Sequence, residues 1–302
     1  MKNLLLLSLL FFSTIAFAQT VRRVNADATV TGINVYQSLQ AAHDAATTGD
    51  VLIVEPGGSV GDLTCNKTLT IYGKGSGSSV VGTININANN VKISGCTGGN
   101  VYINGVTGVV ISRNNFNYLS IGGLASAPAS NITISQNIVS SVDLNGVSTG
   151  LVSNITFSNN FFGNIVGSNS FTSNITVNQN YFSGGYNGQP KPYNCSFTNN
   201  KFQSVLAIDF NTYNSLYFYN AFATGSTVDS GMGSNNIFVT TFSDPQLLTS
   251  SSTGGEIGPY GGATPYVNNL IPATPAVTKL RSDGVGNSTT PITLTISAKS
   301  NN

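Results

Sequence analysis

Residues 154–162 read NITFSNNFF, residues 174–182 read NITVNQNYF, and residues 194–202 read NCSFTNNKF. Each segment starts with an asparagine, carries a second asparagine six positions later, and ends on a phenylalanine two positions after that. A constant period of about 20 residues indicates one structural unit stacked on copies of itself. The sequence therefore predicts a solenoid in which each repeat forms one coil of a parallel β-helix.

The second asparagine of these segments can be followed over seven coils, with a slightly longer interval in the first two steps than in the later ones. The positions are Asn114, Asn137, Asn160, Asn180, Asn200, Asn220 and then Thr240, with apolar partners Phe116, Val139, Phe162, Phe182, Phe202, Phe222 and Phe242 two positions later. Stacked amides hydrogen bond from coil to coil, so we expect a buried structural ladder that fixes the register. The first asparagines predict a second buried ladder, formed by Asn131, Asn154, Asn174, Asn194 and Asn214 and continued by Ser234.

Short segments that alternate apolar and small polar residues predict about ten strands in one column, from 51–54 to 237–240. The predicted fold class is all-β, a single-stranded right-handed parallel β-helix. Before it, Leu39, Ala42, His43 and Ala46 share one face of a helix predicted over 36–46, which would cover the open first coil. After it, residues 290–296 alternate as a last strand that we expect to fold back over the final coil. The predicted boundaries are 1–18 for a signal peptide, 19–50 for an N-terminal cap, 51–245 for the coils, and 246–302 for a C-terminal cap or extension.

Residues 1–18 carry Lys2, an apolar run and a closing Ala16-Phe17-Ala18, the pattern of a secretory signal peptide cleaved near Ala18. We therefore expect a secreted, periplasmic or cell-surface protein without a membrane span. Charged residues make up 8% of the chain and the net charge is +1, which argues against nucleic acid as a partner. Cys65, Cys96 and Cys195 are too few for a disulfide framework and predict buried free thiols. We expect a monomer.

Three further stretches carry a resemblance to known families. Residues 38–46 (SLQAAHDAA), 49–57 (GDVLIVEPG) and 69–73 (LTIYG) resemble the start of many right-handed parallel β-helix proteins. The repeats are similar to coils of the pectate-lyase-like superfamily. The C-terminal segments Asp244-Pro245 and 257–262 (IGPYGG) resemble the C-terminal end of exported β-helix proteins of Bacteroidetes-type bacteria. The resemblance implies the fold and export. It leaves the activity open, because the superfamily includes lyases, hydrolases, epimerases, esterases and proteins with no known chemistry.

Catalysis would need carboxylates that lie close together. Asp209 and Asp229 each follow a ladder asparagine by nine positions, so they should stack one coil apart, near the separation used by retaining glycosidases. A lyase of the pectate-lyase type would also use calcium and an Arg or Lys base, but Arg113, Lys191 and Lys201 share no ladder phase with the two aspartates. The alternative interpretation is two solvated turn residues.

Aromatic residues offer a binding site instead. Tyr193 and Tyr213 lie one period apart and, with Tyr186 and Tyr219, form a candidate shelf for the apolar faces of sugars. The alternative is that these rings only cover the edge of a coil. One histidine and few sulfur ligands argue against a metal site, and we expect no cofactor apart from calcium under the lyase alternative.

Two further patterns follow from the repeat. Glycosylation sequons occur at Asn131, Asn154, Asn174 and Asn194, but we interpret them as by-products of the repeat because these asparagines are assigned to a buried ladder. Pairs of small polar side chains point outward on four coils and form a grid like that of ice-binding β-helices. The pairs are Thr133/Ser135, Thr156/Ser158, Thr176/Asn178 and Ser196/Thr198, and Leu216 and Phe218 interrupt the grid on the next coil.

Together these patterns favour a secreted protein that binds a polysaccharide or a cell-surface glycan without catalysis. A polysaccharide lyase or glycoside hydrolase acting in a groove, and a purely structural surface or adhesion protein, remain the alternatives. Charge is scarce, and the sequence carries no catalytic triad or phosphate loop.

Overall fold

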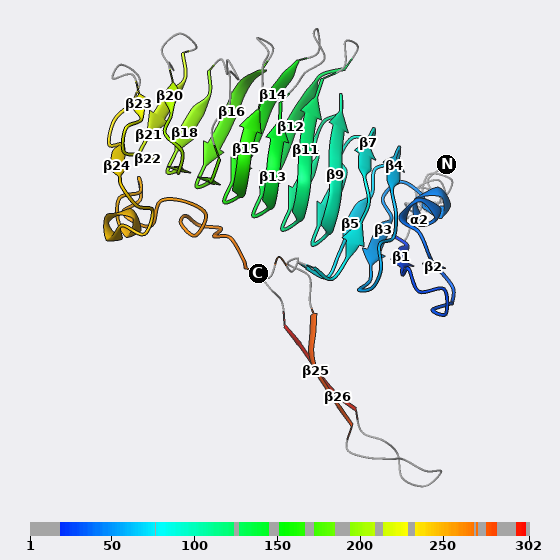
Figure 1. The fold of residues 1–302 in the computed structure, drawn as a ribbon. Helices are drawn as coiled ribbons and strands as arrows, with labels where there is room; N and C mark the ends of the chain where they lie inside the picture. Colours follow the sequence, from blue (N-terminus) through cyan, green and yellow to red (C-terminus); the bar gives the residue numbers. More distant parts are fainter. Residues whose placement is uncertain are drawn as a thin grey trace, which may run out of the picture.

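The chain forms a parallel β-solenoid of about eight turns (Figure 1). A computed structural model describes residues 19–75, 77–123, 127–144, 151–166, 172–184, 194–208, 214–228, 233–268, 270, 276–282 and 294–299. Each turn adds one strand to each of two long parallel sheets, here named sheet A and sheet B. The predicted fold class of an all-β parallel solenoid is therefore confirmed.

Sheet A has eleven strands, and neighbours pair in parallel. In spatial order they are β2 (Val35–Tyr36), β1 (Val21–Val24), β3 (Val51–Val54), β5 (Thr70–Tyr72), β8 (Lys92–Ser94), β10 (Val110–Ser112), β12 (Ala129–Ser135), β14 (Val152–Ser158), β16 (Thr172–Asn178), β18 (Ser196–Thr198) and β21 (Leu216–Phe218).

Sheet B also has eleven strands. In spatial order they are β24 (Ile237–Val239), β22 (Ala221–Ala223), β19 (Lys201–Phe202), β17 (Tyr181–Phe182), β15 (Phe161–Val166), β13 (Ile138–Asp143), β11 (Asn115–Gly122), β9 (Thr97–Asn104), β7 (Ile84–Ile86) and β4 (Leu63–Cys65), with β6 (Val80–Val81) also paired to β9. Two short strands, β20 (Ala207–Ile208) and β23 (Thr227–Val228), pair with each other.

The predicted count of ten coils is slightly too high. Nine of the predicted strands, β3 to β21, follow one another in sheet A as expected and delimit the eight turns. The tenth, predicted at 237–240, is β24 and belongs to sheet B.

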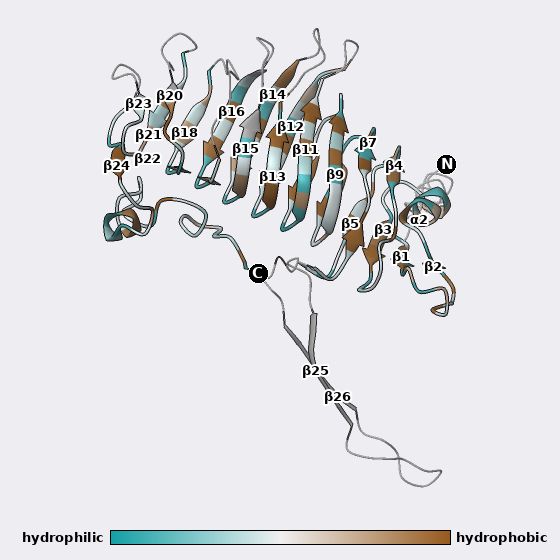
Figure 2. Ribbon diagram, viewed as in Figure 1, coloured by the Kyte–Doolittle hydropathy of each residue, from teal (hydrophilic) through white to brown (hydrophobic). Residues whose placement is uncertain are grey.

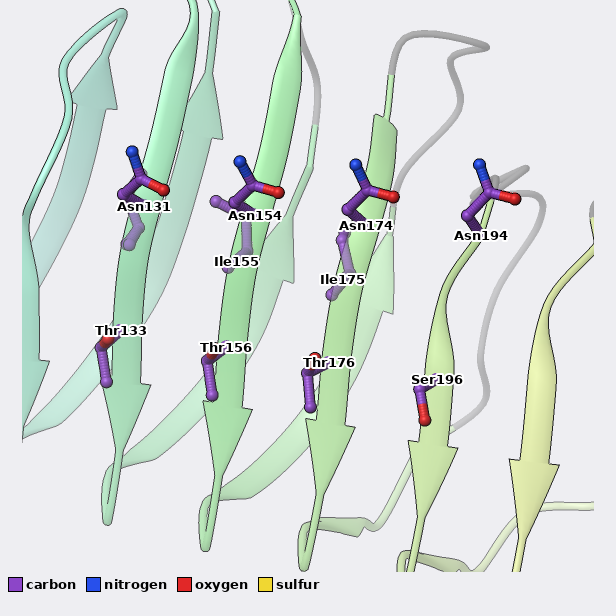
Figure 3. A pocket seen from close by; sticks show the side chains of 11 residues that line it. Asn131, Thr133, Asn154, Ile155, Thr156, Asn174, Ile175, Thr176, Asn194 and Ser196 are labelled. Carbon is purple, nitrogen blue, oxygen red and sulfur yellow. The ribbon is translucent and has the colours of Figure 1, made fainter.

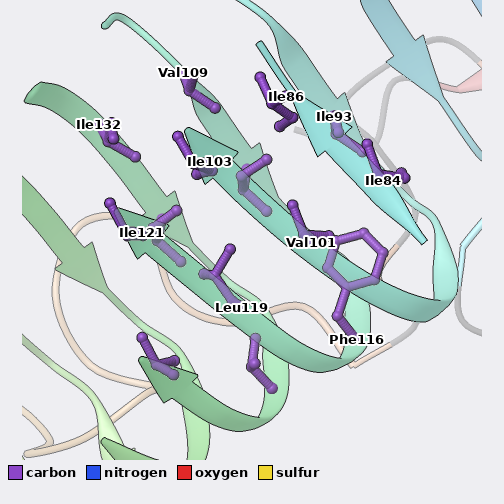
Figure 4. Packing of buried hydrophobic residues seen from close by; sticks show 14 of the residues in the cluster. Ile84, Ile86, Ile93, Val101, Ile103, Val109, Phe116, Leu119, Ile121 and Ile132 are labelled. Carbon is purple, nitrogen blue, oxygen red and sulfur yellow. The ribbon is translucent and has the colours of Figure 1, made fainter. Parts of the chain in front are cut away.

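Branched aliphatic and aromatic side chains from both sheets fill the interior. Apolar and polar residues alternate along the strands in Figure 2, because successive side chains of a strand point to opposite faces. Figure 4 shows Ile84, Val101 and Leu119 of sheet B strands and Ile93 and Ile132 of sheet A strands among the buried cluster. The three cysteines are buried and free, as predicted.

The buried asparagine ladder is confirmed from Asn114 to Asn220, and each of the six asparagines is fully buried. Each Nδ2 from Asn114 to Asn200 donates to the Oδ1 of the asparagine one coil further on, over 2.9 to 3.1 Å. The predicted column of apolar partners is also present beside it, and part of it forms a ring stack: Phe182 and Phe202 lie 4.8 Å apart, and Phe202 and Phe222 lie 5.1 Å apart, nearly parallel. Both columns fix the register, because a slip of one residue would bury the wrong face of each strand.

The last coil breaks the predicted register. Asn220 Nδ2 donates to Asn236 Oδ1 over 3.2 Å, and Phe222 pairs with Phe238. The predicted seventh rung at Thr240 and its partner Phe242 are therefore wrong, because the step between rungs is 16 positions here and 20 in the coil before it. For the same reason Ser234 lies opposite Phe218 and does not continue the column of Asn214.

A short helix covers the first coils, as expected. Helix α2 (Leu39–Ala45) starts at Ser38, whose Oγ accepts the Ala41 N–H over 3.2 Å, and it buries Leu39, Ala42 and His43. Lys67 Nζ donates to the carbonyls of His43, Asp44 and Ala46 at the end of the helix, which satisfies groups that have no partner within a helix.

The final coil is covered differently from the prediction. A 3₁₀ helix, η2 (Pro245–Leu248), and Ile257 pack their buried side chains against Ala221 and Val239. The predicted last strand is β26 (Leu294–Lys299), which pairs antiparallel with β25 (Ala276–Ser282) instead of closing the solenoid. Residues 290–293 lie outside the described part of the chain.

Candidate functional site

The outer face of sheet A carries two columns of small polar side chains. The threonine column consists of Thr133, Thr156, Thr176 and Ser196, which are direct neighbours in β12, β14, β16 and β18. The serine column consists of Ser94, Ser112, Ser135 and Ser158, followed by Asn178 and Thr198. Because coils repeat at about 4.8 Å, these columns present hydroxyl groups at a regular spacing along the solenoid axis.

Exposed asparagines form one border of this face. All five have φ near +55° and lie within or just before strands of sheet A: Asn131, Asn154, Asn174, Asn194 and Asn214. Asparagine tolerates this left-handed conformation better than most residues, which explains its recurrence at this position. The sequence prediction of a second buried ladder is wrong, since all five side chains are exposed. We call them the asparagine column (Figure 3).

Between the asparagine and threonine columns lies a hollow of about 550 Å³, lined by residues from Asn131 to Ser196. A second hollow of about 460 Å³ continues toward the first coils and includes Tyr72, Lys92, Arg113 and the serine column. Thr133 lines both hollows, so they adjoin at this residue, and we name the two hollows together the sheet A trough.

The Tyr72 end of the trough differs from the rest. Tyr72 is half-buried and Lys92 is exposed. Tyr72 pairs with Ser94 of the next strand, and Ser94 Oγ accepts a hydrogen bond from Ser112 Oγ over 3.2 Å. Arg113 donates from Nε to Gln136 Oε1 over 2.6 Å, and burial lowers the pKa of its guanidinium. An aromatic ring, an ammonium group and several hydroxyls therefore meet in this hollow.

The opposite border is made by a C-terminal strap, residues 244–268, which runs back along the solenoid (Figure 1). A column of turn residues with φ near +57° holds it. Gln136 Nε2 donates to Pro265 O over 2.6 Å, Asn159 Nδ2 donates to Gly261 O over 2.8 Å, and Gln179 Oε1 accepts the Gly258 N–H over 2.9 Å. Thr264 of the strap lines the trough directly.

Five of the residues predicted to act in catalysis or sugar binding lie outside the described part of the chain: Asp209, Asp229, Tyr186, Tyr193 and Tyr213. The fourth tyrosine of the predicted shelf, Tyr219, is a half-buried turn residue with φ of 55° whose N–H donates to Ser234 O over 3.2 Å. It lies in the turn column and lines neither hollow. Sequence analysis did not identify Tyr72 as a site residue, because the coils before Asn114 vary in length and the repeat period does not align their residues.

A tyrosine–carboxylate pair on sheet B also escaped sequence analysis. Tyr118 Oη donates to Asp143 Oδ2 over 2.6 Å, and the rings of Tyr102 and Tyr118 lie 5.9 Å apart. Burial and the Asp143 carboxylate raise the pKa of Tyr118 to about 12. The phenol therefore stays protonated as a hydrogen-bond donor, and the pair is a structural contact between two coils.

Three observations concern metal, thiol and carboxylate groups among the described residues. They contain no group of three or more His, Cys, Asp or Glu side chains placed to hold a metal ion. Burial raises the pKa of the Cys96 and Cys195 thiols to about 12, which makes thiolates scarce at neutral pH. Neither hollow of the trough has a carboxylate among its described lining residues.

Comparison with known proteins finds a relative that matches part of the chain. No protein-family model matches the chain. A protein of Methanothermus fervidus named "Cell surface glycoprotein" is 36% identical over 130 residues, which cover 40% of this chain and 21% of that protein. The chain thus spans about a fifth of the length of this relative. Across the described residues, no helix is long and apolar enough to cross a membrane.

Proposed function

We propose that this chain is an exported surface protein that binds linear polysaccharide in the sheet A trough without cleaving it. The observation that carries the proposal is the regular column of hydroxyls that ends at Tyr72. A linear glycan lying along the solenoid axis would meet the same kind of group at each coil. Such repetition favours a repetitive ligand over a single small molecule.

The chemistry of the trough fits a sugar chain. Serine and threonine hydroxyls both donate and accept hydrogen bonds, as sugar hydroxyls do. Tyr72 offers an apolar ring face together with a phenol group, the combination that suits the apolar side of a sugar ring. Lys92 adds a positive charge at the same end, which would favour glycans that carry carboxylates or sulfates.

A surface location is supported by two observations. The N-terminal residues have the pattern of a signal peptide, and the partial relative is named for the cell surface. That name describes the relative, and its similarity covers less than half of this chain.

The test is retention on insoluble polysaccharides. Purified mature protein is incubated with a panel of neutral and acidic glycans, with and without calcium, and both depletion from solution and new reducing ends are measured. We expect depletion without product. Product formation would instead support the lyase or hydrolase alternative with Asp209 and Asp229, and neither effect would support a purely structural role.

Matched variants locate the site. Tyr72→Ala should weaken retention by roughly three- to tenfold, the loss expected for one aromatic contact. Tyr219→Asn is the control, because asparagine suits the left-handed turn at that position and Tyr219 lies outside the trough. If Tyr72→Ala binds normally while Tyr193→Ala/Tyr213→Ala does not, the binding site is the tyrosine shelf and the trough assignment is wrong.

A further inference from the structure

The asparagine column coincides with a repeated sequence signal. Four consecutive coils each place a hydroxyl residue two positions after the exposed asparagine, in Asn131-Ile132-Thr133, Asn154-Ile155-Thr156, Asn174-Ile175-Thr176 and Asn194-Cys195-Ser196. Each matches the acceptor sequence for N-linked glycosylation, Asn-X-Ser/Thr with X other than proline. The sequence interpretation of these matches as by-products depended on buried asparagines, and the structure places the asparagines on the surface.

The geometry of each triplet suits an attached glycan. The middle residue points into the core: Ile132, Ile155, Ile175 and Cys195 are 0 to 3% exposed. The asparagine and the hydroxyl residue therefore both point outward, and both line the same hollow. Figure 3 shows the four amides projecting from the sheet on the same side. A glycan on Nδ2 would extend into solvent without displacing a core side chain.

We propose that the asparagine column is an acceptor site for N-linked glycans, added by an oligosaccharyltransferase from a lipid-linked glycosyl phosphate. In that step Nδ2 of the asparagine forms a bond to the anomeric carbon of the sugar. The bond between that carbon and the phosphate oxygen breaks, the lipid phosphate leaves with the electron pair, and a proton of the amide passes to a base of the transferase.

The structure sets two conditions on this modification. Because the middle residue is buried, the transferase must reach the triplet before the coil packs, so transfer accompanies export or folding. Because adjacent asparagines are one coil spacing, ~4.8 Å, apart, glycans on neighbouring coils would crowd each other. Partial occupancy is therefore expected, with neighbouring sites competing.

The column contains its own control. Asn214 has a φ of 53°, compared with 55° at Asn194, and its side chain is also exposed, but residue 216 is a leucine. Its triplet therefore lacks the hydroxyl that the transferase requires. Two other matches to the acceptor sequence lie outside the column, at Asn66 and Asn287, so the sites must be assigned peptide by peptide.

The decisive measurement is mass spectrometry of peptides from the full chain isolated from its native host. A glycan is expected on at least one of Asn131, Asn154, Asn174 and Asn194, and none on Asn214. If all four are recovered unmodified, or if Asn214 carries the same glycan, the proposal is overturned.

Two variants expressed in that host sharpen the result. Thr176→Val keeps the asparagine and the branched side chain but removes the hydroxyl, so the glycan at Asn174 should disappear while the melting temperature is retained. Leu216→Thr creates the missing acceptor and should introduce a glycan at Asn214. A glycan that persists at Asn174 in Thr176→Val would contradict recognition of the triplet.

This inference and the proposed function fail separately. The four acceptor asparagines line the hollow of about 550 Å³, whereas Tyr72 lines the neighbouring hollow of about 460 Å³. Thr176→Val removes the acceptor at Asn174 and also one hydroxyl of the trough, so its readout is the glycan at Asn174 and not polysaccharide retention. Tyr72→Ala should weaken polysaccharide retention by roughly three- to tenfold while it keeps its glycans.

Discussion

Asn180 donates both its side-chain Nδ2 and its backbone N–H to one oxygen of Asn200, Oδ1, over 3.1 and 2.9 Å. Nδ2 also donates to the carbonyls of Phe157 and Asn178, and the Oδ1 of Asn180 accepts the same pair of bonds from Asn160. One buried amide per coil thus satisfies backbone groups of neighbouring coils. Buried polar groups are costly without such partners, so the ladder is a requirement of the fold.

The first prediction concerns this ladder. Asn180→Leu should destabilise the protein by more than about 3 kcal/mol, because several buried groups lose their partners and each costs ~1–3 kcal/mol. Urea unfolding measures the loss. Asn174→Gly, in the exposed column of the same coil, is the control and should change stability little, since glycine accepts its positive φ. Equal stability of Asn180→Leu and wild type would refute the structural role of the ladder.

The second prediction concerns the ring stack. Phe202 is 2% exposed and lies between Phe182 and Phe222, so Phe202→Ala should cost about 3–5 kcal/mol through lost burial and a cavity. Phe238 ends the same stack and is 51% exposed. Phe238→Ala should cost far less in the same thermal or urea unfolding experiment. If Phe202→Ala and Phe238→Ala lower the free energy of unfolding by similar amounts, the position of a ring within the stack does not determine the cost of removing it.

The third prediction concerns the strap. A methyl group at Gly261 would overlap the Glu256 carbonyl oxygen and press on the Gln179 amide that holds the strap. Gly261→Ala should therefore loosen residues 244–268 and speed their cleavage in limited proteolysis. At Gly255 the nearest atom to an added methyl is Ser251 Oγ at 3.7 Å, an ordinary contact, so Gly255→Ala serves as the control. Unchanged cleavage of Gly261→Ala would mean that the strap is not held at this point.

The fourth prediction concerns pH. Burial of Asp50 acts to raise the pKa of its carboxyl, but hydrogen bonds from the Thr47 and Thr20 N–H groups and from Arg22 outweigh it and leave the pKa lowered. A lowered folded pKa stabilises the protein above the unfolded value of about 3.9, and this stability is lost as the pH falls through the folded pKa.

Asp50→Asn should therefore be less stable than wild type at pH 7, and the difference should shrink below about pH 4. Thermal unfolding at pH 7 and pH 3 measures it. A difference that stays constant over this range would contradict the assignment of the effect to the ionised carboxylate.

The sequence predicted the solenoid because stacked coils force like residues into columns, and a regular period reports those columns directly. It failed where the period changes. The last coil is shorter than its neighbours, so the match of Thr240 and Phe242 to the earlier period pointed to the wrong partners, and Asn236 and Phe238 take their places. The spacing of residues alone does not reveal a shortened coil.

The candidate site was harder to predict for a different reason. The repeat period led to the prediction that both asparagine columns are buried, although only the column of Asn180 is buried and the column of Asn174 is exposed. Asn180 bonds to backbone groups of the interior, whereas Asn174 has a positive φ and an exposed side chain, and a shared period does not distinguish these two environments. The strap contacts join Gln136 to Pro265, which lie far apart in the chain, and no local pattern predicts such a pairing.

The uniform rungs between Asn160 and Asn220 have a consequence for inheritance. Loss of residues 181–200 in frame would join Asn180 directly to Lys201, so Asn180 would take the place of Asn200 beside Asn220 and every remaining coil would still find a matching neighbour. Recombination between repeats of the gene can therefore shorten or lengthen this chain by whole coils. Proteins that arise in this way differ in the length of the solenoid but keep the same buried contacts between coils.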